Sequence, residues 1–175
     1  KKRKGNIILT GFMGTGKSTI GKAIAKRLGR PFIDTDILIE EEAGMTIPVI
    51  FAERGEEQFR ALERTIIGQV CDQQQEAVIA TGGGAMVNEE NVQRLKESGT
   101  VICLTATPEV LLSRVRGNED RPLLKGDDPL GKIKTLLNAR AEAYAKADMT
   151  IDTSLLGVED VIETIGSRLQ LSMRN

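Results

Sequence analysis

The 175-residue chain contains no histidine, and this absence removes two kinds of chemistry at once. Acid–base catalysis by imidazole and metal sites with histidine ligands are both excluded. Cysteine is scarce as well, because Cys71 and Cys103 are the only two and lie far apart. We interpret both as reduced, buried apolar side chains in a predicted helix and a predicted strand, which argues against a disulfide or a cysteine metal site.

Long apolar runs and an excess of charge are also absent. No stretch approaches the roughly 18 residues of a membrane span, and no signal-peptide core opens the chain, so we expect a cytoplasmic protein. The formal net charge of -1 gives no reason to expect nucleic acid or an anionic membrane as a partner. The length predicts a single domain over residues 1–175, and we expect it to act as a monomer.

The chain does contain a phosphate-binding motif between a short apolar strand and a helix with apolar residues at helical spacing. The motif is Gly11-Phe12-Met13-Gly14-Thr15-Gly16-Lys17-Ser18-Thr19. In such a loop, backbone N–H groups cradle phosphate oxygens, the lysine reaches the β- and γ-phosphates, and the serine hydroxyl ligates Mg²⁺. The alternative is a glycine-rich turn without a ligand. We predict ATP binding by Gly14, Thr15, Gly16, Lys17, Ser18 and Thr19.

Further short apolar runs alternate with amphipathic helices along the whole chain. The predicted strands lie at residues 6–10, 32–33, 77–80, 101–104 and 149–152. Continuously apolar short strands separated by helices are typical of a parallel sheet buried on both faces. The sequence therefore predicts an α/β fold of the P-loop NTPase type, a doubly wound sheet of about five parallel strands with helices on both faces.

Polar residues and glycines follow two of these strands. Asp34 and Asp36 end the second strand, where ligands bind in open α/β sheets, although an aspartate there can also cap the next helix. Gly82, Gly83 and Gly84 follow the third strand. Three consecutive glycines indicate that the backbone approaches a ligand closely, the alternative being a flexible loop. Both positions favour a binding crevice beside the phosphate loop.

Two further segments are expected to complete the protein. Residues 35–65 form a small helical region, in which Thr46 is expected to cap a helix and Gly55 to interrupt it. Arg60 and Glu63 share a face there, which by itself is typical of a surface ion pair. Residues 114–128 are polar, basic and turn-rich, which indicates either a mobile lid or a solvated loop. Arginines that close over the γ-phosphate favour a small-metabolite or nucleoside kinase.

Six segments carry a more specific resemblance, in order and over nearly the whole chain. They are Gly11–Thr19, Asp34-Thr35-Asp36, Phe51-x3-Gly55-Glu56-x2-Phe59-Arg60-x2-Glu63, Gly82-Gly83-Gly84, Arg121-Pro122-Leu123-Leu124 and Arg140-x3-Tyr144. With these motifs the chain resembles the shikimate kinases. The resemblance implies ATP-dependent phosphorylation of the 3-hydroxyl of shikimate, giving shikimate 3-phosphate and ADP in aromatic amino-acid biosynthesis, with one Mg²⁺ ion.

On the acceptor side, the resemblance implies that Asp36 contacts the acceptor hydroxyl as a base or as a positioner. It implies that Arg60 and Arg140 bind the shikimate carboxylate, to which a guanidinium presents a planar fork that lysine cannot copy. It also implies that backbone N–H groups of Gly82 and Gly83 contact the substrate. The expected substrate region is residues 35–65, joined by these glycines and Arg140.

On the nucleotide side, the resemblance implies catalytic roles for Lys17 and for Arg121, a lid residue at the ATP phosphates. It implies that Arg114 stacks on adenine, and that Asp34 helps Ser18 hold Mg²⁺. Alternatives remain open at this point. They are a gluconate-type or nucleotide kinase on the same fold, and a nucleotide-binding module without catalysis.

Overall fold

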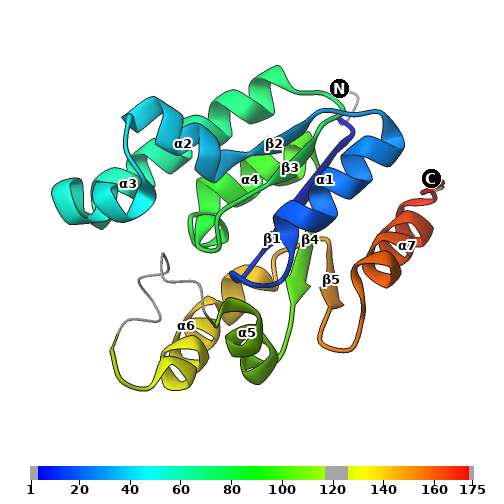
Figure 1. Ribbon diagram of the computed structural model, residues 1–175. Helices are drawn as coiled ribbons and strands as arrows, with labels where there is room; N and C mark the ends of the chain where they lie inside the picture. Colours follow the sequence, from blue (N-terminus) through cyan, green and yellow to red (C-terminus); the bar gives the residue numbers. More distant parts are fainter. Residues whose placement is uncertain (1–3, 117–125, 174–175) are drawn as a thin grey trace.

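A computed structural model describes residues 4–116 and 126–173, and its centre is one parallel sheet (Figure 1). The strands are β1 (Asn6–Gly11), β2 (Phe32–Asp34), β3 (Val78–Ala80), β4 (Gly99–Thr105) and β5 (Met149–Asp152). Their spatial order is β2-β3-β1-β4-β5. Every neighbouring pair runs parallel, which confirms the predicted doubly wound α/β fold.

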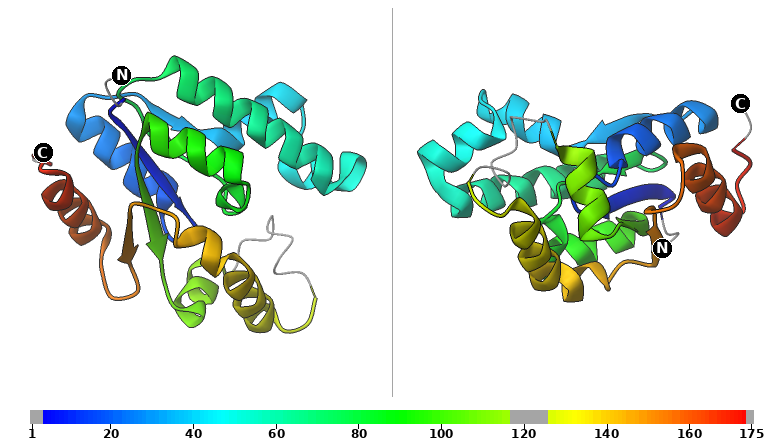
Figure 2. Two further views of the ribbon diagram at one scale, coloured as in Figure 1. Left: turned by 180° about the vertical axis from the view of Figure 1, so that it is seen from behind. Right: turned by 60° about the horizontal axis from the view of Figure 1, so that its bottom comes forward.

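Helices cover both faces of this sheet. They are α1 (Lys17–Leu28), α2 (Thr35–Ala43), α3 (Ile47–Gln73), α4 (Glu89–Ser98), α5 (Pro108–Val115), α6 (Pro129–Tyr144) and α7 (Val158–Leu169), with a short 3₁₀ helix η1 (Ala85–Val87). Side chains alternate between the two faces of a strand. Ile7 and Leu9 of β1 therefore pack with residues of α1 and α7, whereas Ile8 packs with residues of α3 and α4. Figure 2 shows these two pairs of helices on opposite sides of the sheet.

The register of the central strands brings the candidate segments to one edge. Leu9 of β1 pairs with Ala80 of β3, and Ala80 pairs with Asp34 of β2. The chain leaves these three strands at the phosphate loop, at α2 and at the glycine segment, which we define as residues 82–84. Segments that are distant in sequence thus meet at the carboxyl ends of adjacent strands, where open α/β sheets bind ligands.

The helical region after β2 departs in one detail from the expected capping. Gly55 has φ 85° and ψ 166° inside α3, so it interrupts the helix as predicted. Thr46 occupies the N-cap position of α3 as predicted, but its side chain makes no capping hydrogen bond. The Glu40 carboxylate of α2 accepts the Ile47 N–H at 2.8 Å instead, which ties the two helices together.

Two further expectations concern membrane-spanning segments and the lid. In the part of the chain that the structure describes, no helix is both long enough and apolar enough to cross a membrane. Most of the segment predicted as a lid, residues 117–125, lies outside the described residues, and Arg121 with it. The lid therefore stays a prediction.

Candidate active site

The phosphate loop joins the central strand β1 to helix α1. Gly16 precedes the first residue of α1 with φ 90°, a left-handed conformation that glycine adopts without strain. No side chain caps this helix, so the first-turn N–H groups are not satisfied by a capping oxygen. A helix N-terminus of this kind attracts phosphate through its N–H groups and its dipole.

Two side chains of the loop are fixed by contacts within it. The Lys17 ammonium donates to the carbonyl oxygen of Gly11, so the lysine folds back over the loop. The Thr15 hydroxyl donates to the Phe12 carbonyl at 2.8 Å and is buried. Thr15 is therefore available to a ligand through its backbone, whereas the side chain of Thr19 is exposed on α1.

Asp34 uses its two carboxylate oxygens for different purposes. One oxygen accepts the backbone N–H groups of Asp36 and Ile37, at 2.9 and 3.4 Å, and so caps α2. The other accepts the Ser18 hydroxyl at 3.1 Å. Capping and a place at the phosphate loop were alternatives in the sequence, and the structure gives this residue both.

Asp36 lies one residue into α2 and faces the glycine segment. A Cβ atom on Gly82 would lie 2.7 Å from its Oδ1, so only glycine allows this approach. That oxygen is buried and has no hydrogen-bond partner among the described residues. Burial raises the pKa of Asp36 to about 6; the Lys17 charge opposes the shift, and the Asp34 charge adds to it. A buried acceptor without a partner is typical of a functional position.

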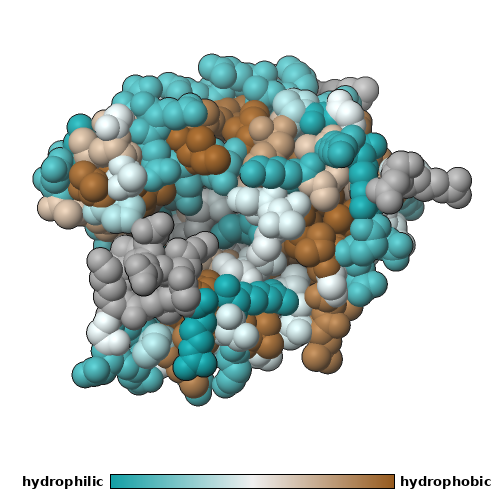
Figure 3. Space-filling view, viewed as in Figure 1, coloured by the Kyte–Doolittle hydropathy of each residue, from teal (hydrophilic) through white to brown (hydrophobic). Residues whose placement is uncertain are grey.

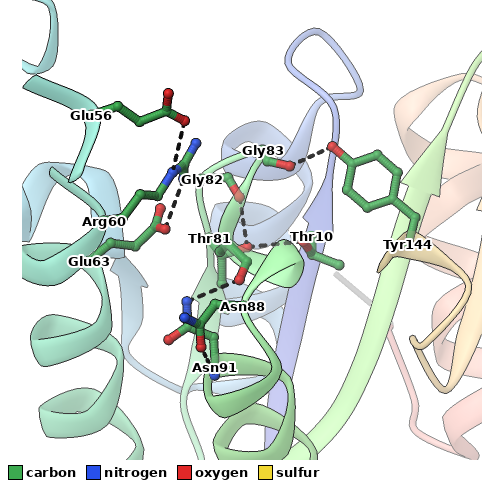
Figure 4. Close-up of polar contacts among 11 residues, drawn as sticks. Thr10, Glu56, Arg60, Glu63, Thr81, Gly82, Gly83, Asn88, Asn91 and Tyr144 are labelled. Carbon is green, nitrogen blue, oxygen red and sulfur yellow. Dashed lines mark hydrogen bonds and ion pairs between the residues drawn. The ribbon is translucent and has the colours of Figure 1, made fainter. Parts of the chain in front are cut away.

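Arg60 is held by an ion pair that is buried at one end. Its guanidinium donates to Glu63 at 2.9 Å and lies 3.7 Å from Glu56 (Figure 4). The Glu63 side chain is only 1% exposed, which separates this pair from an ordinary surface ion pair. Burial raises the pKa of Glu63, while the charges of Arg60 and Arg140 lower it. The carboxylate therefore lies within the field of both arginines.

The structure brings Arg60 and Arg140 to successive residues of the glycine segment. A Cβ atom on Gly83 would lie 3.1 Å from Nη1 of Arg140, and one on Gly84 would lie 2.5 Å from Nη2 of Arg60. The guanidinium of Arg140 also lies 5.6 Å from the centre of the Phe12 ring. Two residues that are 80 positions apart in number thus flank the same short piece of backbone.

The glycine segment has backbone donors to offer between these arginines. Within residues 4–116 and 126–173, no acceptor takes the N–H groups of Gly82, Gly83 or Gly84. The segment also lies against the phosphate loop, because a Cβ atom on Gly83 would be 3.5 Å from the Gly11 carbonyl oxygen. Free N–H donors beside two guanidinium groups form a place for an anion, next to the proposed site of the phosphates.

Arg114 connects the phosphate loop to the segment that follows β5. Its guanidinium donates to the Gly14 carbonyl at 3.3 Å, and to the hydroxyl and carbonyl of Thr153 at 2.8 and 2.7 Å. These contacts use the edge of the guanidinium. Arg114 therefore lies on the β4–β5 side of the loop, away from the glycine segment on the β3 side.

The surface agrees with a site at this edge of the sheet. The face of the molecule seen in Figure 3 is hollowed near its middle, where the exposed residues are pale to teal rather than brown. Among the described residues no group of three or more histidine, cysteine, aspartate or glutamate side chains gathers to hold a metal. Ser18 and Asp34 are the predicted metal-binding pair, and the structure does bring them together.

Comparison with known proteins decides the family. A family model described as shikimate kinase matches residues 13–170. This chain belongs to the shikimate kinase family. The resemblance inferred from six sequence motifs is therefore confirmed over almost the whole chain.

Individual relatives support the same conclusion. The chain is 48% identical over 165 residues to a shikimate kinase of Geobacter sulfurreducens, covering 93% of this chain and 89% of that protein. It is also similar to a solved shikimate kinase of Acinetobacter baumannii in complex with shikimate, with a TM-score of 0.89, 37% identity and coverage of 95% and 93%. A gluconokinase of Sinorhizobium meliloti, at 19% identity and a TM-score of 0.58, shares the fold alone.

Some residues of the site were not predicted as site residues. A hydrogen bond of 3.1 Å joins the hydroxyls of Thr81 and Thr10, which links the ends of β3 and β1. Asn91 of α4 donates to the Ala85 carbonyl at 3.0 Å, and Tyr144 of α6 donates to the Gly83 carbonyl. Each supports the glycine segment or its neighbours from outside. Of the three, only Tyr144 stood in a recognisable motif, four residues after Arg140.

Proposed function

We infer that this chain is a shikimate kinase, which transfers the γ-phosphoryl group of ATP to the 3-hydroxyl of shikimate. The observation that carries this conclusion is the anion site formed by Arg60, Arg140 and the unpartnered N–H groups of the glycine segment. This site adjoins both the Asp36 carboxylate and the phosphate loop. An acceptor that bears a carboxylate and a hydroxyl fits these three features together.

On the acceptor side, we assign the shikimate carboxylate to Arg60 and Arg140. The Arg60 guanidinium donates one hydrogen bond to Glu63. Other N–H groups of the same guanidinium remain for a ligand. N–H groups of Gly82 and Gly83 supply further donors. Bidentate contacts from two arginines select a planar anion and fix its orientation.

Asp36 is proposed to act on the acceptor hydroxyl. Its buried Oδ1 is an acceptor in need of a donor, and the hydroxyl of an alcohol is one. The hydrogen bond orients the oxygen toward the phosphate loop. The carboxylate either takes the hydroxyl proton as a base, late in a loose phosphoryl transfer, or only positions the hydroxyl.

On the nucleotide side, the phosphates are assigned to the loop N–H groups of residues 14–19 and to Lys17. Arg114 is proposed to stack on adenine. The geometry supports this role, because the hydrogen bonds of the guanidinium lie along its edge and its planar faces remain for stacking. Arg121, outside the described residues, is proposed to meet the phosphates. Cationic donors there stabilise the charge that spreads over the transferred group.

The reaction with ATP implies a divalent metal, and we propose Mg²⁺. The Ser18 hydroxyl and the Asp34 carboxylate are hard oxygen donors 3.1 Å apart, which suits this ion. When bound, Mg²⁺ neutralises phosphate charge. Two protein ligands are enough, because phosphate oxygens and water complete its coordination.

We also propose an oligomeric state and a cellular location. All the assigned groups come from one copy of the chain, which supports a monomeric enzyme. The reaction consumes ATP, which supports a cytoplasmic location.

The test is a coupled assay of ADP release with shikimate, gluconate or AMP as acceptor. We expect Mg²⁺-dependent release with shikimate and background rates with the other two. Release with gluconate or AMP in preference to shikimate would overturn the substrate assignment. ATP binding without release to any acceptor would favour a non-catalytic module.

A further inference from the structure

The chain contains one tyrosine, Tyr144, and its phenol points into the candidate site (Figure 4). Tyr144 is the last residue of α6, and its hydroxyl donates to the carbonyl oxygen of Gly83, 61 residues away. The side chain is 7% exposed. A buried hydroxyl that reaches a backbone carbonyl of the glycine segment fixes a piece of chain that has no side chains of its own.

The orientation of that carbonyl decides what the segment presents to a ligand. The Gly83 carbonyl and the Gly84 N–H belong to one trans peptide, so they point in opposite directions. With the carbonyl directed at Tyr144, the Gly84 N–H is directed away from it, on the residue beside the Arg60 guanidinium. If this peptide turned over, a carbonyl oxygen would face the anion site and repel a carboxylate.

Glycine makes such a turn easy, so the segment needs external restraints. The preceding peptide has two of them, because the Gly82 carbonyl accepts the Ala85 N–H at 3.2 Å and the Thr81 hydroxyl at 3.3 Å. For the Gly83 carbonyl, the only donor within the described residues is the Tyr144 phenol. This single contact therefore holds the second peptide of the segment.

The same helix also carries Arg140, one turn before Tyr144. The two side chains interact, since the charge and a hydrogen bond of Arg140 lower the pKa of the Tyr144 phenol. Burial is the larger influence and raises that pKa, so the phenol keeps its proton and remains a donor. One face of α6 thus supplies a guanidinium for the ligand and a donor for the backbone beside it.

We propose that Tyr144 is a positioning residue for carboxylate binding, which holds the Gly83–Gly84 peptide with its N–H toward the anion site and ties it to Arg140. The proposal rests on the proposed shikimate kinase activity. Tyr144 does not touch the reacting atoms. It sets the direction of the Gly84 N–H and the position of this donor relative to the Arg140 guanidinium.

The test is Tyr144→Phe, which removes only the hydroxyl oxygen. We expect the shikimate KM to rise about tenfold, because the peptide loses its restraint and a partly buried carbonyl loses its donor. The ATP KM should stay within about twofold of wild type, since no nucleotide group is assigned to this peptide. Such a split between the two KM values does not follow from a general loss of stability.

The matched control is Ser98→Ala. Ser98 is buried, and its hydroxyl donates to the Leu95 carbonyl at 3.0 Å at the far end of α4. This variant also loses one hydroxyl-to-carbonyl hydrogen bond, but we expect both KM values to be unchanged. A shikimate KM in Tyr144→Phe within about twofold of wild type would overturn the proposal.

A second measurement needs no variant. Because the chain has no tryptophan and one tyrosine, its intrinsic tyrosine emission comes from Tyr144 alone. Shikimate, which has no aromatic ring, should change this emission with a midpoint that follows its KM. No change at saturating shikimate, with wild-type turnover present, overturns the role of Tyr144 alone. A wild-type protein that does not turn over shikimate overturns the proposed function, and this proposal with it.

Discussion

The nucleotide half and the acceptor half of the candidate site are built in different ways. The nucleotide half is one continuous run, Gly11–Thr19, which offers backbone N–H groups from a loop and a helix end. The acceptor half is assembled from Asp36 on α2, Arg60 on α3, the glycine segment and Arg140 on α6. A continuous half can be recognised by spacing alone, whereas an assembled half depends on the fold that brings its parts together.

This difference predicts separable kinetics, and the largest effect is expected at the point where the halves meet. Lys17→Ala should lower kcat about 10³-fold, because a preorganised cation is lost from the transferring phosphate. Steady-state ADP release with saturating shikimate measures it. Lys26→Ala, an exposed lysine in the last turn of the same helix, is the control and should be silent. Near-normal turnover in Lys17→Ala would contradict the role of the phosphate loop.

The second effect concerns Asp36, the residue proposed to act on the acceptor hydroxyl. Asp36→Asn keeps the shape but removes charge and basicity, and kcat should fall about 10²-fold with little change in ATP affinity. Glu41→Gln, an exposed change on the same helix, should leave kcat unchanged. A collapse of ATP binding with turnover spared would move Asp36 to the metal site.

The third effect tests whether the acceptor half acts as one unit. Arg60→Lys and Arg140→Lys should each raise the shikimate KM about tenfold, because a bidentate contact becomes a point charge. The ATP KM should barely move. The double variant should lose less shikimate-binding free energy than the sum of the two single losses, since both arginines are assigned to one ligand group.

Arg54→Lys is the matched control, because Arg54 is exposed on α3 before the Gly55 kink. Its KM values should equal those of wild type. An unchanged shikimate KM in both single variants would remove the carboxylate site from the assigned residues.

The last effect is on stability and follows from the raised pKa of Asp36, about 6 in the fold against 3.8 for an ordinary aspartate. The folded protein binds this proton more tightly, so the stability contribution is full below pH 4 and is lost as the pH rises through 6. Above pH 7, ligand-free Asp36→Asn should be more stable than wild type by up to about 3 kcal/mol. Urea unfolding across this range measures the difference. The prediction is contradicted if the difference in unfolding free energy between Asp36→Asn and wild type is the same at pH 5 and at pH 8.

The sequence predicted the fold well because its signals are local. Short apolar runs located all five strands, and the single residue Gly55 located the break in α3. The capping of α3 was missed because the acceptor, Glu40, lies on the preceding helix. A contact between helices leaves no pattern in the nearby residues.

The candidate site was predicted unevenly for the same reason. The spacing of the phosphate loop is enough to assign it, but only the family resemblance joined Arg60 to Arg140 before the structure did. The burial of Glu63 and the contact from Tyr144 to Gly83 are tertiary facts, and a helical i, i+3 pair or an isolated tyrosine does not indicate them. The roles of Arg121 and of the segment 114–128 stay predictions.

The strand order β2-β3-β1-β4-β5 has a consequence for how this catalyst can change. The chain after β2 and β3 carries proposed acceptor contacts, β1 leads into the phosphate loop, and the chain after β4 and β5 carries Arg114 and Thr153. On the proposed assignments, the sheet is therefore laid out in the order of acceptor, transferred phosphoryl group and adenine. Arg140 and Tyr144 are exceptions to this order. They are assigned to the acceptor side, but α6, which carries them, lies between β4 and β5 in the chain. A new acceptor specificity can therefore arise at one edge of the sheet while the ATP edge is kept, provided that α6 changes with it.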